Sequence, residues 1–189
     1  MNVAQSSAST ALSALDALYS SATLTLYQGA IPTSPETAIG TQTALAKFTF
    51  ASPAFAAPVF TSLQEVATAS FASASVLPSA NGTACFARAV ASTYGTVLAD
   101  YTVGAAWQAG AAVIAGQYVI SNGNTYVCQT AGTTAASGGP SGTGTNIADG
   151  TTLWNFNNAG STDIVISTTA LSTGVPLSVT SLTHALPAV

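Results

Sequence analysis

Few side chains in this sequence could carry out catalysis. The chain has one histidine, His184, near its carboxyl end, and six carboxylates that occur singly. Nucleophilic catalysis by serine needs a histidine base oriented by a third group, and no acid neighbours His184 in the sequence. The many serines single out no partner for it. The sequence therefore predicts that His184 is an exposed or edge-strand residue, that the chain has no catalytic residues, and that it is not an enzyme.

Metal and cofactor sites are not expected either. Cys85 and Cys128 are far apart, and one histidine with two distant cysteines does not give the spacing of a zinc site. In a reducing cytoplasm both would remain free thiols. The glycine-rich run 138–144 superficially resembles a phosphate-binding loop, but it lacks the lysine and the strand-to-helix context. We therefore expect no metal and no cofactor.

Charge excludes two classes of partner. Only Lys47 and Arg88 are basic among 189 residues, charged residues make up 4%, and the net charge is −4. Nucleic-acid binding needs several cations to displace counterions, and a polybasic membrane patch needs them too. The least polar window, 102–120, is diluted by Gln and Gly, so it does not predict a membrane span. We expect no nucleic acid, no membrane, and no secretory signal, because no cation precedes the mildly apolar N-terminal stretch.

One ion pair can be anticipated from the pattern of strands. Arg88 lies in an apolar run, and a bend over residues 91–96 would place it across from the segment that contains Asp100. Pairing would neutralise both side chains if they are buried. We expect Arg88 and Asp100 to form a structural ion pair, with a role of Arg88 at a subunit contact as the alternative.

The elements that position these residues are mostly short strands. Residues 7–21 carry leucines at helical spacing, which predicts a short amphipathic helix. After it, alternating apolar and polar residues recur between Gly and Pro breaks, a pattern typical of a sandwich or a barrel. We expect a mainly β protein, an antiparallel, jelly-roll-like β-sandwich, with a short N-terminal helix and a small inserted β module.

The composition shifts between residues 105 and 159. This stretch contains both tryptophans, a hairpin signal at Asn122-Gly123 and a long Gly-rich loop from 130 to 150. We predict a body of residues 1–104 plus 160–189 and an inserted module of residues 105–159. In so small a unit most aromatic side chains are needed for its core, while one or two could face outward and stack on sugars.

Three stretches of the body stand out as motifs: Leu24–Pro32 (LTLYQGAIP), Gly82–Arg88 (GTACFAR) and Asp163–Ile166 with Gly174 downstream. In these stretches the body resembles a family of small tailed-bacteriophage structural proteins encoded among head and tail morphogenesis genes. The family typically has Trp and Phe where this chain has Phe86 and Ala87. The resemblance implies a virion structural protein, and in its most specific form a capsid decoration (cement) protein.

The module is distantly similar to the chitin-binding modules of carbohydrate-binding families five and twelve, a short repeat found on many phage tail and virion proteins. The positions that carry this are Trp107, Gly116, Val119, Asn122-Gly123, Tyr126–Cys128, Gly139-Pro140, Gly142, Asp149-Gly150 and Trp154. Exposed aromatic rings hold polysaccharide in those modules. The resemblance therefore implies Trp107, Tyr126 and Trp154 as glycan-binding residues.

Together these expectations describe a protein located in the virion and assembled in the cytoplasm of a host bacterium. Its partners would be the major capsid protein or other virion proteins, and it would form a homo-oligomer. An uncharged surface suits such an assembly better than it suits a free monomer. The alternative is an adhesin on a tail or head fibre that binds host surface glycans through the inserted module.

Overall fold

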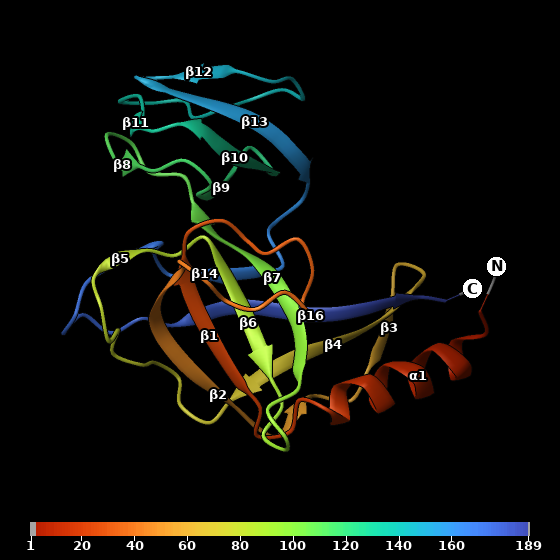
Figure 1. Cartoon of the computed structure of the whole chain (residues 1–189). Helices are drawn as coiled ribbons and strands as arrows, with labels where there is room; N and C mark the ends of the chain where they lie inside the picture. Colours follow the sequence, from red (N-terminus) through yellow and green to blue (C-terminus); the bar gives the residue numbers. More distant parts are fainter. Residues whose placement is uncertain (1–2, 189) are drawn as a thin grey trace.

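The computed structural model describes residues 3–188 and has a mainly β fold (Figure 1). This confirms the expected class. In the described chain one helix, α1 (Gln5–Ala17), precedes sixteen strands: β1 (Thr23–Gln28), β2 (Thr43–Phe55), β3 (Val59–Thr61), β4 (Gln64–Phe71), β5 (Gly82–Thr83), β6 (Phe86–Val90), β7 (Val97–Ala106), β8 (Ala112–Val113), β9 (Tyr118–Ser121), β10 (Asn124–Thr130), β11 (Gly132–Thr133), β12 (Ile147–Asp149), β13 (Thr152–Ala159), β14 (Ile164–Ile166), β15 (Ala170–Leu171) and β16 (Val179–Pro187).

Seven of the strands close into a barrel. The hydrogen-bonded order β7-β14-β16-β4-β2-β1-β6 returns to its start because β6 also pairs with β7. All these pairings are antiparallel except that of β14 with β7. The expected jelly-roll sandwich of two separate sheets is thus corrected to a closed barrel. Closure leaves no free edge on the strands of the ring where they pair, which two open sheets would have to protect by other means.

The barrel core follows from alternation along the strands. Leu24 and Leu26 of β1 and Phe48 and Phe50 of β2 are buried at every second position, while the residues between them face outward. Phe50 stacks on Phe71 with ring centroids 4.9 Å apart. One continuous apolar cluster therefore fills the barrel.

The second sheet grows from the barrel through β7. Its residues 97–102 pair with β6, whereas Gly104 pairs with Val165 of β14 and with Tyr118 of β9. The sheet continues through β10 and β13 to β12, and the hairpin of β8 with β11 lies beside it (Figure 1). A Cβ on Gly104 would come within 2.8 Å of the Thr162 side chain, so glycine permits this crowded junction.

A separate apolar cluster holds the second sheet together. Its buried members are Val113, Val119, Tyr126, Cys128 and Trp154. All of them lie inside the predicted module, 105–159, and the predicted hairpin is present, with Asn122 and Gly123 both at positive φ between β9 and β10. The division into a body and a module remains a prediction.

Helix α1 buries a different face from the one that its leucines suggest. The helix ends at Ala17, and its buried side chains are Ala8, Leu12 and Asp16, whereas Leu15 and Leu18 are 42% and 57% exposed. Asp16 faces the barrel because its carboxylate contacts His184 of β16. The leucine pair is thereby turned outward. No helix within residues 3–188 is long and apolar enough to span a membrane.

Candidate functional site

The three aromatic residues expected to bind glycan occupy very different environments. Tyr126 and Trp154 are completely buried, so neither can present a ring face to a sugar. Trp107 is partly exposed and packs against the same cluster. A Cβ on Gly139 would lie 3.0 Å from the Trp107 ring, so the neighbouring backbone already covers part of that ring. The assignment of Tyr126 and Trp154 as binding residues is therefore corrected: their rings form the module core.

One carboxylate organises both indoles of the module. The Nε1–H groups of Trp107 and Trp154 donate to the same oxygen of Asp149, over 2.8 and 3.0 Å. The other Asp149 oxygen accepts the backbone N–H of Ala135 at 2.9 Å. Asp149 itself is 4% exposed, so these donors replace water around a buried charge. The arrangement is a structural centre of the module.

The long Gly-rich loop is fastened to the second sheet. Tyr126 donates its hydroxyl hydrogen to the Gly142 carbonyl at 2.9 Å, and the backbone N–H of Phe156 donates to the Gly144 carbonyl at 3.0 Å. The side-chain amide of Asn122 donates to the Pro140 carbonyl. Hydrogen-bonding groups of the loop thus point at its own sheet, and the run serves as a cover for the module core.

Arg88 and Asp100 lie opposite each other on β6 and β7 and form the expected pair. Two parallel hydrogen bonds of 2.6 Å join the guanidinium to both carboxylate oxygens, and Arg88 also donates to the Thr37 carbonyl at 2.8 Å. Hydrogen bonding to Asp100 raises the pKa of Arg88. Both side chains are about 5% exposed, so the pair is a buried structural contact of the barrel wall.

The sequence predicts an exposed or edge-strand His184, and the structure places it in β16 opposite Ala67 of β4, with its side chain only 12% exposed. Its Nδ1 lies 2.6 Å from Oδ1 of Asp16 on α1, and its Nε2 lies 2.9 Å from the Tyr101 hydroxyl of β7. Tyr101 in turn donates to the Tyr19 hydroxyl at 2.8 Å. The imidazole also stacks on Phe55, with ring centroids 4.2 Å apart. A polar chain of four residues therefore connects the helix to the barrel.

This network has no nitrogen free for base catalysis. Nε2 of His184 lies against the Tyr101 hydroxyl and Nδ1 lies against the Asp16 carboxylate, so both ring nitrogens already have a polar partner. No described serine hydrogen-bonds to His184; Ser20 and Ser52 bond to each other at 2.7 Å. No group of three metal-ligating side chains occurs within residues 3–188. The geometry supports a structural tether.

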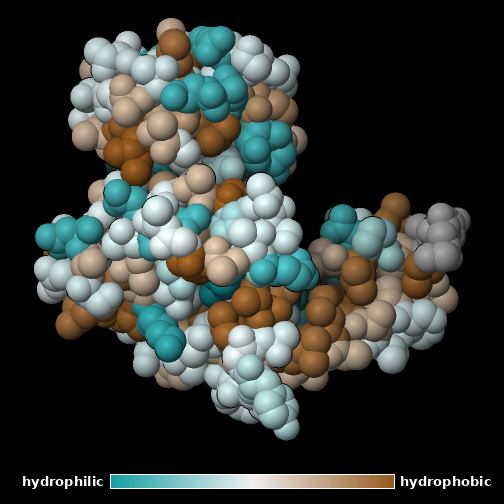
Figure 2. Space-filling model, viewed as in Figure 1, coloured by the Kyte–Doolittle hydropathy of each residue, from teal (hydrophilic) through white to brown (hydrophobic). Residues whose placement is uncertain are grey.

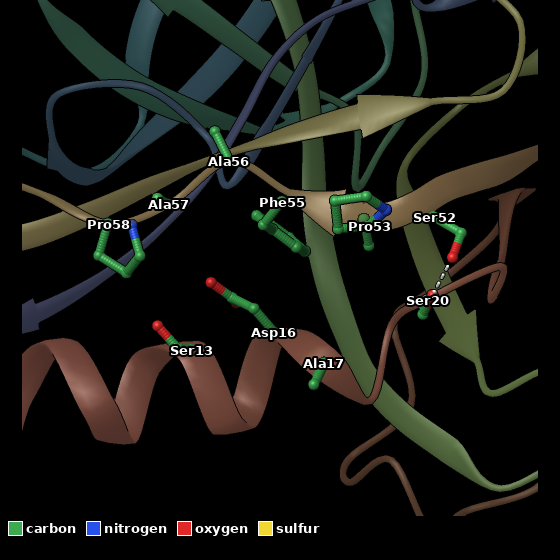
Figure 3. Close-up of a pocket in the computed structure, with 11 residues that line it drawn as sticks. Ser13, Asp16, Ala17, Ser20, Ser52, Pro53, Phe55, Ala56, Ala57 and Pro58 are labelled. Carbon is green, nitrogen blue, oxygen red and sulfur yellow. Dashed lines mark hydrogen bonds between the residues drawn. The ribbon is translucent and has the colours of Figure 1, made fainter.

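A cavity of about 560 Å³ opens beside the tether, between the C-terminal half of α1 and the segment Ser52–Pro58 (Figure 3). The pairing of β2 with β4 is interrupted between Phe50 and Phe55, which releases this segment from the regular ladder. Figure 3 shows the Asp16 carboxylate projecting from α1 into this space. Its Oδ2 is buried and has no hydrogen-bond partner among the described residues.

The same side of the molecule exposes apolar side chains. Helix α1, β3 and the adjoining ends of β4 and β16 extend sideways from the barrel (Figure 1), and we call this part the apolar arm. Its exposed large hydrophobic residues are Leu15, Leu18, Val59, Phe60 and Leu63. Figure 2 shows hydrophobic atoms along α1 and over the barrel surface next to it. Several exposed apolar side chains on one part of a molecule are consistent with a protein-contact region.

Both cysteines are free and buried. Burial raises the pKa of the Cys85 thiol, and it raises that of Cys128 to about 11. Thiolates are the reactive form of cysteine, so these side chains behave as small hydrophobic residues.

Sequence reasoning missed the tether and the arm. Asp16 and His184 lie 168 positions apart, and nothing local links them. The placement of Asp16 four residues after the buried Leu12 was the only available signal that a carboxylate shares the buried stripe of the helix.

No family model, no curated protein and no solved structure matched this chain.

Proposed function

We propose that this chain is a structural protein of a tailed-phage virion, a capsid decoration protein that docks on the major capsid protein through the apolar arm. The observation that carries the proposal is the arm itself, which exposes Leu15, Leu18, Val59, Phe60 and Leu63 on a chain with 4% charged residues. Such a surface has much to gain from burial against a neighbour.

The turn between β3 and β4 supports this use of the arm. Ser62 and Leu63 have φ values of 48° and 65°, in the left-handed region that glycine and asparagine favour. Leu63 is also 62% exposed, so it is unfavourable both in backbone conformation and in hydration. The Leu63 carbonyl accepts a hydrogen bond from the Ala188 N–H, but its side chain is left in solvent, which is consistent with a contact formed on assembly.

β3 adds a second means of attachment. It pairs with β4 on one side, and no described strand pairs with its other edge. All three of its residues are exposed. A strand of the capsid protein could extend the sheet there while its side chains cover Val59 and Phe60.

The glycan adhesin has weaker support. Two of the three rings assigned to sugar contact are in the module core, and Trp107 is tied to Asp149 and partly covered. Five of the exposed large hydrophobic residues of the described chain lie on the arm, and none lies in residues 105–159.

Particles that carry the chain provide the test. We expect it to remain bound in about 1 M NaCl, where the Debye length falls to about 3 Å and exposed ion pairs are screened. Leu18→Lys together with Leu63→Lys should abolish particle binding, whereas Val175→Lys, at an equally exposed site outside the arm, should not. Release of the unaltered chain by salt, or full binding by the double variant, would contradict the proposal.

A further inference from the structure

A groove along the arm contains two buried carboxylates that no lysine or arginine among residues 3–188 contacts. Pro58 lines both the cavity between α1 and Ser52–Pro58 and a second hollow of about 510 Å³, whose lining also includes Ser6 and Ser9 of α1, Phe60 of β3 and Glu65 of β4. Asp16 is 6% exposed and lines the first hollow, while Glu65 is 2% exposed and lines the second. The groove therefore has an acidic group at each of two positions.

Neither carboxylate is fully satisfied by the described chain. His184 contacts Oδ1 of Asp16, but the buried Oδ2 has no partner. No hydrogen bond or ion pair among residues 3–188 reaches the Glu65 side chain. Ionised carboxylates are costly to bury unless cations or hydrogen-bond donors compensate them.

Neither the lysine nor the arginine of this chain lines the groove. Arg88 is committed to Asp100 on the other side of the barrel wall. Lys47 is exposed on β2, where it lies opposite Thr25 of β1. A lysine or arginine side chain in the groove would therefore come from another molecule.

We propose that the groove between α1 and the segment 52–60 binds an extended basic segment of the partner protein, with one lysine or arginine on Asp16 and another on Glu65. This inference rests on the proposed function, since it names the chemistry of the capsid segment that docks there. Apolar stems of the basic residues would pack on Phe55 and Phe60, and their charged ends would reach the carboxylates. The free edge of β3 lies beside this path.

Spacing along the helix suggests the spacing of the two cations. Ser9 and Asp16, which line the two hollows, are separated by about 10 Å of helix at 1.5 Å per residue. Residues on one face of an extended strand recur at intervals of about 7 Å, so basic residues two or four positions apart span the groove. Ion pairs formed there would be shielded from solvent, so they are consistent with binding that resists salt.

The test uses the whole protein and a defined probe. An acetylated and amidated Lys-Thr-Val-Thr-Lys peptide is titrated into the labelled protein, and backbone amide shifts are followed by NMR. We expect saturable shifts confined to residues 5–20 and 52–65. The matched peptide with norleucine in place of both lysines should produce no saturable shifts.

Variants assign the binding to the groove. Glu65→Gln removes a charge without breaking any described hydrogen bond, and it should weaken peptide binding about tenfold or more. Glu36→Gln, which neutralises an exposed carboxylate outside the groove, should bind as the unaltered chain does. Thermal unfolding of each variant verifies that its fold is retained.

Three results would overturn the inference: equal binding of the norleucine peptide, unchanged binding by Glu65→Gln, or the same shifts produced by calcium or magnesium chloride alone. None of these requires particles. If the protein does not bind the peptide but remains on particles at high salt, only this inference is contradicted. If salt releases the protein from particles while peptide binding is intact, only the proposed function is contradicted.

Discussion

Asp16 and His184 join the two ends of the fold. They lie 168 positions apart, yet Oδ1 of the carboxylate and Nδ1 of the imidazole are separated by 2.6 Å. The contact holds α1 against β16, and the narrow stripe of Ala8 and Leu12 supplies the rest of the buried helix face. The position of the apolar arm therefore depends on a polar contact as much as on apolar packing.

Replacing His184 with phenylalanine should loosen the helix. Phenylalanine can still stack on Phe55, but it leaves the Asp16 carboxylate buried without a partner, which costs about 3–5 kcal/mol. In hydrogen-exchange measurements, the amides of residues 5–17 should lose protection while those of the barrel strands remain protected. Changing Asp16 to leucine in the same chain should restore much of the stability, and unaltered exchange in the single variant would refute the tether.

Arg88→Met should lower the free energy of unfolding by about 3–5 kcal/mol, because it leaves Asp100 buried and uncompensated. Urea denaturation measures the loss. Lys47→Met, at an exposed position, should change stability by no more than about 0.5 kcal/mol. Equal midpoints for Arg88→Met and the unaltered chain would show that the buried pair contributes nothing.

The two tryptophans of the module should respond differently to truncation. Trp154→Ala removes a completely buried ring and should cost about 3–5 kcal/mol, with module amides losing protection. Any loss of glycan binding in that variant would therefore reflect unfolding. Trp107→Phe keeps an aromatic ring without the indole N–H, so a change in a glycan array with Trp107→Phe, at unchanged module protection, would revive the adhesin alternative.

High pH should destabilise the fold through its buried tyrosines. Burial raises the pKa values of Tyr101 and Tyr19 above the ordinary 10.0. The contribution of these two tyrosines to stability is fully present below the tyrosine pKa of the unfolded chain, because there the phenols are neutral in both the folded and the unfolded state. It is lost as the pH rises above 10.0, because the unfolded chain ionises first.

Tyr101→Phe should therefore make stability fall less steeply above about pH 10, by about 1.4 kcal/mol per pH unit. Urea midpoints between about pH 8 and 11 give the slope. Tyr94→Phe is the matched control, since Tyr94 is 97% exposed. Identical slopes for Tyr101→Phe and the unaltered chain would argue against its burial as a neutral phenol.

Local chemistry accounts for what could be predicted from sequence. Alternation in residues 23–28 marks a strand with Leu24 and Leu26 inward, and Asn122-Gly123 favours a two-residue turn because both tolerate positive φ. The Arg88–Asp100 pairing followed from counting outward from a nearby bend. These features depend on neighbours within a few residues, or within one hairpin.

Three features were decided only by the tertiary structure. Alternation shows which side chains face inward but not which strands pair, so closure of β6 onto β7 and of β14 onto β7 distinguished a barrel from a sandwich. An aromatic residue suits a core or a binding face equally well in sequence, and only packing placed Trp154 and Tyr126 inside. The outward turn of Leu15 and Leu18 was decided by Asp16 and a histidine at the far end of the chain, because a helix rotates to the face whose combined apolar and polar contacts are most favourable.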